Sequence, residues 1–148
     1  METKQIGWLI IIVMASVILF LIGVGFLNSA LISEGNVIYY FAPIMLIPAL
    51  LFYQLTIVVN YQQVNIRFGI GLIRKSWQLN KIEKATAVKT NLLQGWGIHY
   101  SLNTTIYNVT GFKAVELNFK NSKRKVRIGC SEPEKLAEYI NRMVAKKH

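Results

Sequence analysis

The segment AVELNFKNSKRKVRI, residues 114–128, predicts the local fold more clearly than any other part of the chain. Apolar and polar residues alternate along 115–119 and again along 125–128, and a polar run separates the two stretches. Alternation with a period of two is typical of a β-strand with one buried face. We therefore predict an antiparallel hairpin. A four-residue turn would place Phe119 opposite Val126 and Leu117 opposite Ile128.

The same alternation recurs before this hairpin. Strands are expected at 64–68, 72–79, 82–89, 98–102 and 106–109. The connections between them are short and rich in Gly, Asn and Thr, which is typical of an antiparallel meander rather than of βαβ units. Together with the hairpin, this pattern predicts about seven short antiparallel strands.

The chain ends with the pattern of an amphipathic helix. Ser131 and Glu134 have the spacing of a capping box, and Pro133 suits the first turn of a helix. Apolar residues then recur on one helical face, namely Leu136, Tyr139, Ile140, Met143 and Val144. We expect this helix to cover one open end of a curled sheet.

Two long apolar runs precede the strands. Residues 5–33 and 35–66 contain no charged side chain. Within them, 6–32 and 37–59 are each long enough, at about 1.5 Å per helical residue, to cross a hydrocarbon layer of about 30 Å. The sequence therefore predicts a two-span transmembrane helical hairpin.

The predicted hairpin divides the chain into two parts, a membrane part at residues 1–59 and a β domain at residues 60–148. One of the 17 Lys and Arg precedes the first span and the other 16 follow the second. Because cytoplasmic flanks collect Lys and Arg, both termini and the β domain are expected in the cytoplasm. The single cysteine, Cys130, agrees with a reducing compartment and excludes an internal disulfide.

Five short motifs follow one another along the second part of the chain: GWGI (95–98), YNVTG (107–111), AVEL (114–117), RIG (127–129) and EPEKL (132–136). Taken together, they resemble bacterial pleckstrin-homology-like domains. The resemblance implies a bent barrel of about seven antiparallel strands, capped by a C-terminal helix and often preceded by a short membrane hairpin. It also implies a place at the bacterial inner membrane. The turn at 121–123, Asn-Ser-Lys, departs from the Asn-Gly or Asp-Gly often found there.

The sequence lacks the residue patterns typical of catalysis and metal binding. It contains no Asp, and the two histidines, His99 and His148, do not make a metal site with Cys130. The Gly-x-Gly pairs at 69–71 and 95–97 lack the third glycine of a nucleotide fingerprint. We therefore predict a protein without enzymatic activity, cofactor or metal. We also predict no nucleic-acid binding, because the sequence shows no helix of the kind that reads bases in a groove.

Basic residues dominate the predicted β domain, which contains 16 Lys and Arg but only five Glu. The candidate binding residues are Lys120, Lys123, Arg124, Lys125 and Arg127 around the hairpin turn, Arg74 and Lys75 near an earlier turn, and Trp96. The basic residues fit an anionic lipid headgroup or an acidic partner, but they also fit a solvated edge that resists strand-to-strand aggregation. Trp96 either packs in the barrel or lies at its rim.

These patterns predict a membrane-anchored binding or scaffold module that is not an enzyme. Its expected partner is another protein or a second copy of the chain, in addition to the lipid bilayer. The alternative is recognition of an anionic lipid headgroup through the basic hairpin. These two hypotheses remain open at the level of the sequence.

Overall fold

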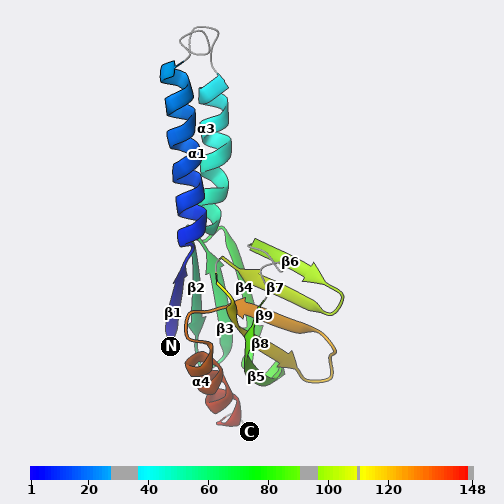
Figure 1. The fold of residues 1–148 in the computed structure, drawn as a ribbon. Helices are drawn as coiled ribbons and strands as arrows, with labels where there is room; N and C mark the ends of the chain where they lie inside the picture. Colours follow the sequence, from blue (N-terminus) through cyan, green and yellow to red (C-terminus); the bar gives the residue numbers. More distant parts are fainter. Residues whose placement is uncertain (28–36, 91–96, 110, 147–148) are drawn as a thin grey trace.

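The computed structural model describes residues 1–27, 37–90, 97–109 and 111–146, which form two β-sheets, a C-terminal helix and a pair of extended helices (Figure 1). The first sheet is antiparallel, in the order β1 (Glu2–Ile6), β2 (Gln54–Val59), β3 (Gln63–Phe68) and β4 (Ile73–Gln78). The second sheet has the order β5 (Ile82–Lys89), β8 (Lys113–Phe119), β9 (Lys125–Gly129), β7 (Thr104–Asn108) and β6 (Gly97–Ser101). A short 3-10 helix, η1 (Leu79–Lys81), connects them.

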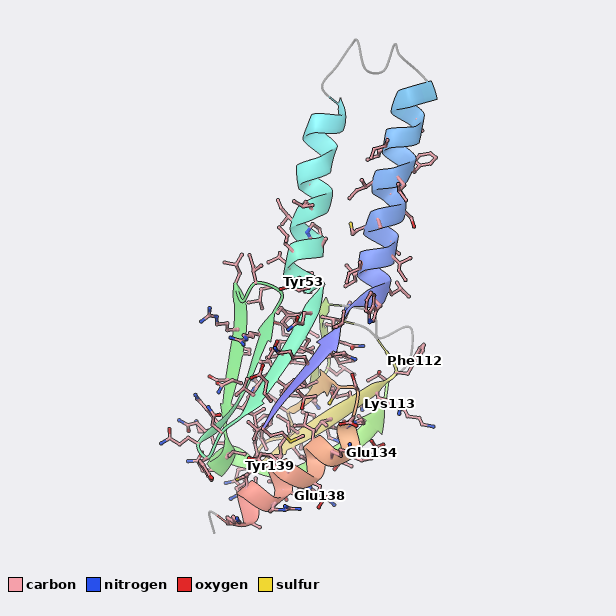
Figure 2. All side chains as sticks on the ribbon, turned by 90° about the vertical axis from the view of Figure 1, so that its left-hand side faces the viewer. Tyr53, Phe112, Lys113, Glu134, Glu138 and Tyr139 are labelled. Atoms are coloured by element: carbon pink, nitrogen blue, oxygen red, sulfur yellow. The ribbon has the colours of Figure 1, made fainter. Side chains whose placement is uncertain are left out.

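Two helices, α1 (Trp8–Leu27) and α3 (Val37–Phe52), lie side by side and extend away from the sheets (Figures 1 and 2). A hydrogen bond connects the start of α1 to the end of α3, because the Gly7 N–H donates to the Tyr53 carbonyl oxygen at 2.7 Å. The β3–β4 turn packs under the end of α3. Gly69 in this turn has a φ of +46°, and a side chain there would collide with the backbone oxygens of Leu50 and Leu51. Only glycine satisfies both requirements.

The prediction of a two-span membrane hairpin is wrong. In the parts of the chain that the structure describes, no helix has the length and apolarity needed to cross a membrane. The C-terminal end of the second apolar run is a strand rather than part of a helix. Gln54–Val59 forms β2 and pairs with Glu2–Ile6, with Lys4 opposite Thr56. α3 is therefore left with 16 residues. At about 1.5 Å per residue it reaches about 24 Å. The predicted link at 33–36 lies outside the described residues.

The prediction of about seven antiparallel strands is also corrected. The described residues contain nine strands in two sheets, and β7 and β9 are parallel, with Ile106 opposite Arg127. β9 lies between β8 and β7, and it is antiparallel to β8 and therefore parallel to β7, because β7 and β8 run in opposite directions. Two strands were missed. β2 lies within the apolar run predicted to be a span, and β1 has the sequence ETKQI, whose polar composition gives little strand signal.

The seven strands predicted from alternation are present, and all of them match the predicted ranges to within two residues. The hairpin at 114–128 is confirmed, but its register differs by two residues. Leu117 lies opposite Val126 and Val115 opposite Ile128, while Phe119 pairs with β5. Because a shift of two residues preserves the alternation, the predicted apolar side chains still share one face.

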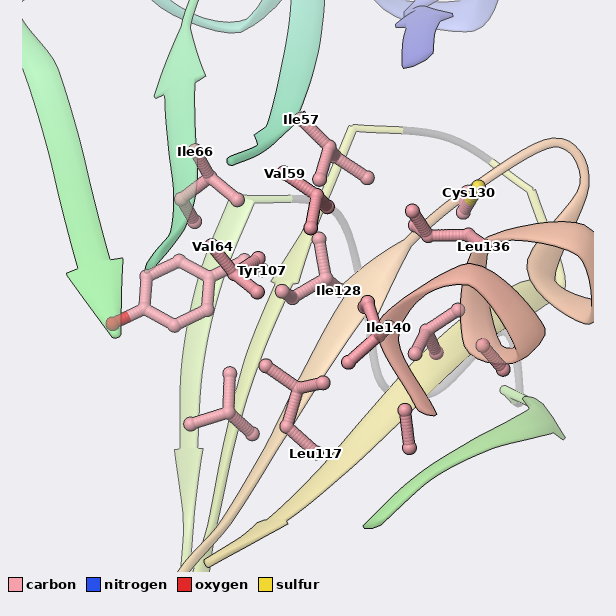
Figure 3. Packing of buried hydrophobic residues seen from close by; sticks show 14 of the residues in the cluster. Ile57, Val59, Val64, Ile66, Tyr107, Leu117, Ile128, Cys130, Leu136 and Ile140 are labelled. Atoms are coloured by element: carbon pink, nitrogen blue, oxygen red, sulfur yellow. The ribbon is translucent and has the colours of Figure 1, made fainter. Parts of the chain in front are cut away.

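The hydrophobic core lies between the two sheets and α4 (Pro133–Ala145). Figure 3 shows Val64 of β3, Tyr107 of β7, Ile128 of β9 and Ile140 of α4 directed into the same space. Burial of an Ile or Leu side chain contributes about 1.5–3 kcal/mol. The amphipathic pattern of the last helix is confirmed: Leu136, Ile140 and Val144 are buried, and Tyr139 and Met143 pack against the core.

The predicted capping box at the start of α4 is wrong. The helix begins at Pro133, so the N-cap residue is Glu132 rather than Ser131, and no side chain makes a capping hydrogen bond. Glu132 instead accepts a hydrogen bond from Lys135 Nζ at 2.7 Å. A cap one residue later than the motif predicts removes the spacing that the box requires.

α4 also closes the outer edge of β5. The side-chain amide of Asn141 donates through Nδ2 to the Ala85 carbonyl oxygen and accepts through Oδ1 from the Ala85 N–H, each at 2.8 Å. These two bonds take the place of those that a neighbouring strand would make. The backbone of Ala85 is therefore satisfied at an edge that would otherwise accept another strand.

We expect Asn141→Ala to lower the free energy of unfolding by about 1–3 kcal/mol, because both backbone groups of Ala85 lose their partner. Urea unfolding followed by tryptophan fluorescence measures the change. Arg142→Ala is the control, since it removes an exposed pair with Glu138 worth about 0–1 kcal/mol. Equal midpoints for the two variants would contradict the role assigned to Asn141.

Candidate functional site

A groove of about 620 Å³ opens between β4, the β6–β7 hairpin and the loop that follows β8. We call it the aromatic–basic groove and define it by six of its lining residues: Trp77, Lys81, Tyr100, Tyr107, Arg124 and Lys125. Its volume falls in the range of about 300–1,000 Å³ that is usual for ligand sites. Aromatic and cationic side chains therefore meet in one concave surface.

The aromatic part of the groove is anchored in the core. Trp77 of the edge strand β4 packs edge-on against Tyr107, with ring centroids 5.5 Å apart, and Phe68 lies 6.2 Å from the same Tyr107 ring. Burial raises the pKa of Tyr107, with a further contribution from Tyr100. The Tyr107 hydroxyl therefore keeps its proton at neutral pH.

The mouth of the groove exposes apolar surface. Tyr100 on β6 is 79% exposed, and Leu102 in the β6–β7 turn is fully exposed with a φ of +25°. A positive φ is uncommon for a residue other than glycine. Large apolar side chains that gather at a concave surface are typical of interaction sites.

The basic residues predicted around the hairpin turn are divided between two places. Arg124 and Lys125 line the aromatic–basic groove. Lys125 Nζ and Arg127 Nε also bind the two oxygens of Glu116, at 3.0 and 2.8 Å. Lys123 is exposed in the same loop but is not among the groove residues. The β8–β9 loop therefore combines a structural ion pair with exposed cations.

Glu116 is the buried centre of this ion pair, with only 8% of its side chain exposed. Burial acts to raise the pKa of Glu116, but hydrogen bonds and charge from Arg127 and Lys125 outweigh it and hold the pKa below its ordinary value. A lowered pKa means that the carboxylate stabilises the folded state at neutral pH. This contribution is lost as the pH falls through the folded-state pKa.

We expect Glu116→Gln to lower the free energy of unfolding at pH 7 by about 1–3 kcal/mol, because two charge-assisted hydrogen bonds are lost. The difference from the native protein should shrink as the pH falls below the unfolded-state pKa of about 4.5. Chemical denaturation from pH 3 to 7 measures it. Glu83→Gln, at an exposed position on β5, should change stability little at any pH. A constant difference across this range would refute the assignment.

Arg74 and Lys75 lie apart from these residues, at a second hollow on the first sheet. This outer concavity has a volume of about 610 Å³, and Asn65, Arg67 and Ser76 also line it. Arg74 Nε donates to the Gly71 carbonyl oxygen at 2.6 Å, which holds the guanidinium near the β3–β4 turn. Arg67 and Arg74 are directly opposite each other in the register of β3 and β4.

The basic residues that the sequence offered as candidates for one function therefore lie in two separate places, at the aromatic–basic groove and at the outer concavity. Trp96 lies outside the described residues. Sequence reasoning did not single out Trp77, Tyr100 or Arg67. The opposition of Arg67 and Arg74 requires a four-residue turn at 69–72, because Phe68 pairs with Ile73. A three-residue turn at 69–71 would place Arg67 opposite Ile73 instead.

Groups that could support chemistry are few among the described residues. No three His, Cys, Asp or Glu side chains lie close enough there to hold a metal ion. Cys130 is fully buried, and burial raises the pKa of its thiol, which keeps the thiol protonated and unreactive. His99 lies on β6 at the edge of the second sheet.

Comparison of this chain with models of protein families, with curated proteins and with solved structures found no match.

Proposed function

We propose that this protein is a non-enzymatic binding module that takes an extended, acidic segment of a partner protein in the aromatic–basic groove. The observation that carries the proposal is the exposed aromatic surface at the mouth of the groove, whose lining contains both Tyr100 and two cations, Arg124 and Lys125. Tyrosine, tryptophan and arginine are the residues that most often dominate protein interfaces.

The strand edges next to the groove support an extended ligand. β4 and β6 are the last strands in the order of their sheets, and both contribute to the lining. In the described part of the chain, neither has a strand partner on its outer side. An extended peptide can add to such an edge through its backbone while its side chains enter neighbouring pockets. The β5 edge is closed to such a ligand by Asn141.

The charge of the groove supports an acidic ligand. Lys81, Arg124 and Lys125 line it, and no Asp or Glu does. The whole chain carries a formal net charge of +10. Complementary charge increases the association rate and selects against basic partners. An acidic segment with apolar residues at alternate positions therefore matches both the cations and the aromatic floor.

Selection from a random ten-residue peptide library on the full-length protein tests the proposal. We expect enrichment of peptides that combine Asp or Glu with aromatic or β-branched residues, and a loss of affinity of about tenfold or more for Tyr100→Ala. Tyr61→Ala is the matched control, because Tyr61 is 80% exposed and lies outside the groove. The two affinities are measured by fluorescence polarisation.

A matched pair of charge variants sharpens this experiment. Arg124→Gln should weaken binding of the selected peptides, whereas Lys123→Gln, at the neighbouring position outside the groove, should leave it nearly unchanged. If no peptide is enriched, or if Tyr100→Ala binds like the native protein, the proposal fails.

A second candidate function is recognition of an anionic lipid headgroup by the β8–β9 loop. It is favoured by the exposure of Lys123 and Arg124, neither of which pairs with a carboxylate of the described residues. It predicts that vesicles with anionic lipid bind more strongly than neutral vesicles, and that the excess falls with salt and in Lys123→Ala/Arg124→Ala. Equal binding to both vesicle types would exclude it.

A further inference from the structure

We propose that the outer concavity of the first sheet binds a phosphate group, held by Arg67, Arg74, Asn65 and Ser76. This site is separate from the aromatic–basic groove, and the inference does not depend on the function proposed for that groove. Asn65 and Ser76 are opposite each other in the β3–β4 register, and Arg67 and Arg74 form the opposed pair two residues along. The four side chains thus make two adjacent rows.

Alternation directs the four side chains to one face. Val64, Ile66 and Phe68 of β3 are buried in the core, so Asn65 and Arg67 point to the other face of the sheet. The register places Arg74 and Ser76 beside them on β4. Rows two residues apart on a strand are separated by about 7 Å. Opposed residues have Cβ atoms about 4.5–5.5 Å apart. A ligand that lies between the two rows can therefore contact donors from both.

The arginines on this outer face of the first sheet, Arg67 and Arg74, form no ion pair within the described part of the chain. Like charges directly opposite on neighbouring strands are destabilising. No carboxylate of the described residues forms an ion pair with Arg67 or Arg74, although such pairs hold Lys125 and Arg127 on the second sheet. Two opposed arginines that form no ion pair with an acid of the described residues make a local concentration of positive charge. An anion from outside the chain would relieve it.

The donor geometry favours phosphate over a simple carboxylate. The Arg74 Nε–H is already bonded to the Gly71 carbonyl oxygen, which fixes the guanidinium and leaves its Nη groups as donors. Together with the Arg67 guanidinium, the Asn65 amide and the Ser76 hydroxyl, these donors come from four different residues. A phosphate offers three or more acceptor oxygens and binds arginine in a bidentate way.

The size of the concavity indicates a larger ligand than the free ion. A volume of about 610 Å³ exceeds what a single phosphate fills, and Val58 adds apolar surface to the lining. The ligand class is therefore a phosphate monoester with a small organic group. Such a group occurs in soluble phosphorylated compounds and in lipid headgroups.

Isothermal titration of the full-length protein with inorganic phosphate tests the inference, in a neutral detergent that covers the exposed apolar side chains of α1 and α3. We expect saturable binding that weakens about 30-fold or more in Arg67→Gln/Arg74→Gln. Arg67→Lys/Arg74→Lys keeps the charge but removes the planar fork, and it should also lose most of the affinity.

The control is Lys84→Gln/Lys89→Gln, which removes two exposed cations of β5 and should bind phosphate as the native protein does. Circular dichroism establishes that all variants are folded. Glycerol 3-phosphate and short-chain phosphatidic acid serve as further probes, and the tighter of the two identifies a soluble or a lipid source. The inference is overturned if none of these probes binds, or if Arg67→Gln/Arg74→Gln binds phosphate as tightly as the control Lys84→Gln/Lys89→Gln.

Discussion

The packing of two sheets against one another is the constraint on which the other features depend. Val64 and Ile66 on β3 meet Leu117 and Ile128 of the second sheet in one core, each at most 2% exposed. A register slip of one residue would turn these side chains towards water. Because the core fixes the inward set of residues, it also fixes the outward set. The positions of the charged side chains on both outer faces are consequences of apolar burial.

The two outer faces treat their charges in opposite ways. On the second sheet, Arg127 lies directly opposite Glu116, and Lys125 completes the neutralisation of the buried carboxylate. On the first sheet, Arg67 lies directly opposite Arg74, with no carboxylate paired to either among the described residues. A structural role accounts for the cations around Glu116. It does not account for two opposed arginines, which cost stability unless an anion joins them.

The local elements could be predicted from the sequence, and the long-range pairing could not. The alternation at 114–119 gave the correct buried face, because side-chain direction in a strand depends only on neighbouring residues. The parallel contact of β7 with β9 depends on which segment fills the space beside β9, and no local pattern encodes that choice. The error for the apolar N-terminal region has a similar origin, since the pairing of Glu2–Ile6 with Gln54–Val59 joins segments about fifty residues apart.

The candidate sites follow the same division. Arg124, Lys125 and Arg74 were predicted because charge is visible in composition, whereas Tyr100 and Trp77 resembled ordinary strand residues. Their meeting in the aromatic–basic groove requires the edge of one sheet to lie beside a hairpin of the other. The alternation along 115–119 places Glu116 on the face opposite to Val115 and Leu117. The burial of Glu116 was missed, because the side chains that cover it come from β9.

The treatment of the sheet edges connects stability with binding. An unprotected edge strand invites pairing with another chain. The β5 edge is closed by Asn141, whereas β4 and β6 end their sheets at the aromatic–basic groove. At that groove the protection is electrostatic, because a second copy of a chain with a net charge of +10 would bring cations against Lys81 and Arg124. The same repulsion becomes attraction for an acidic segment. If the groove binds an acidic segment as proposed, charge at this edge discriminates between aggregation with identical copies and recognition of that partner.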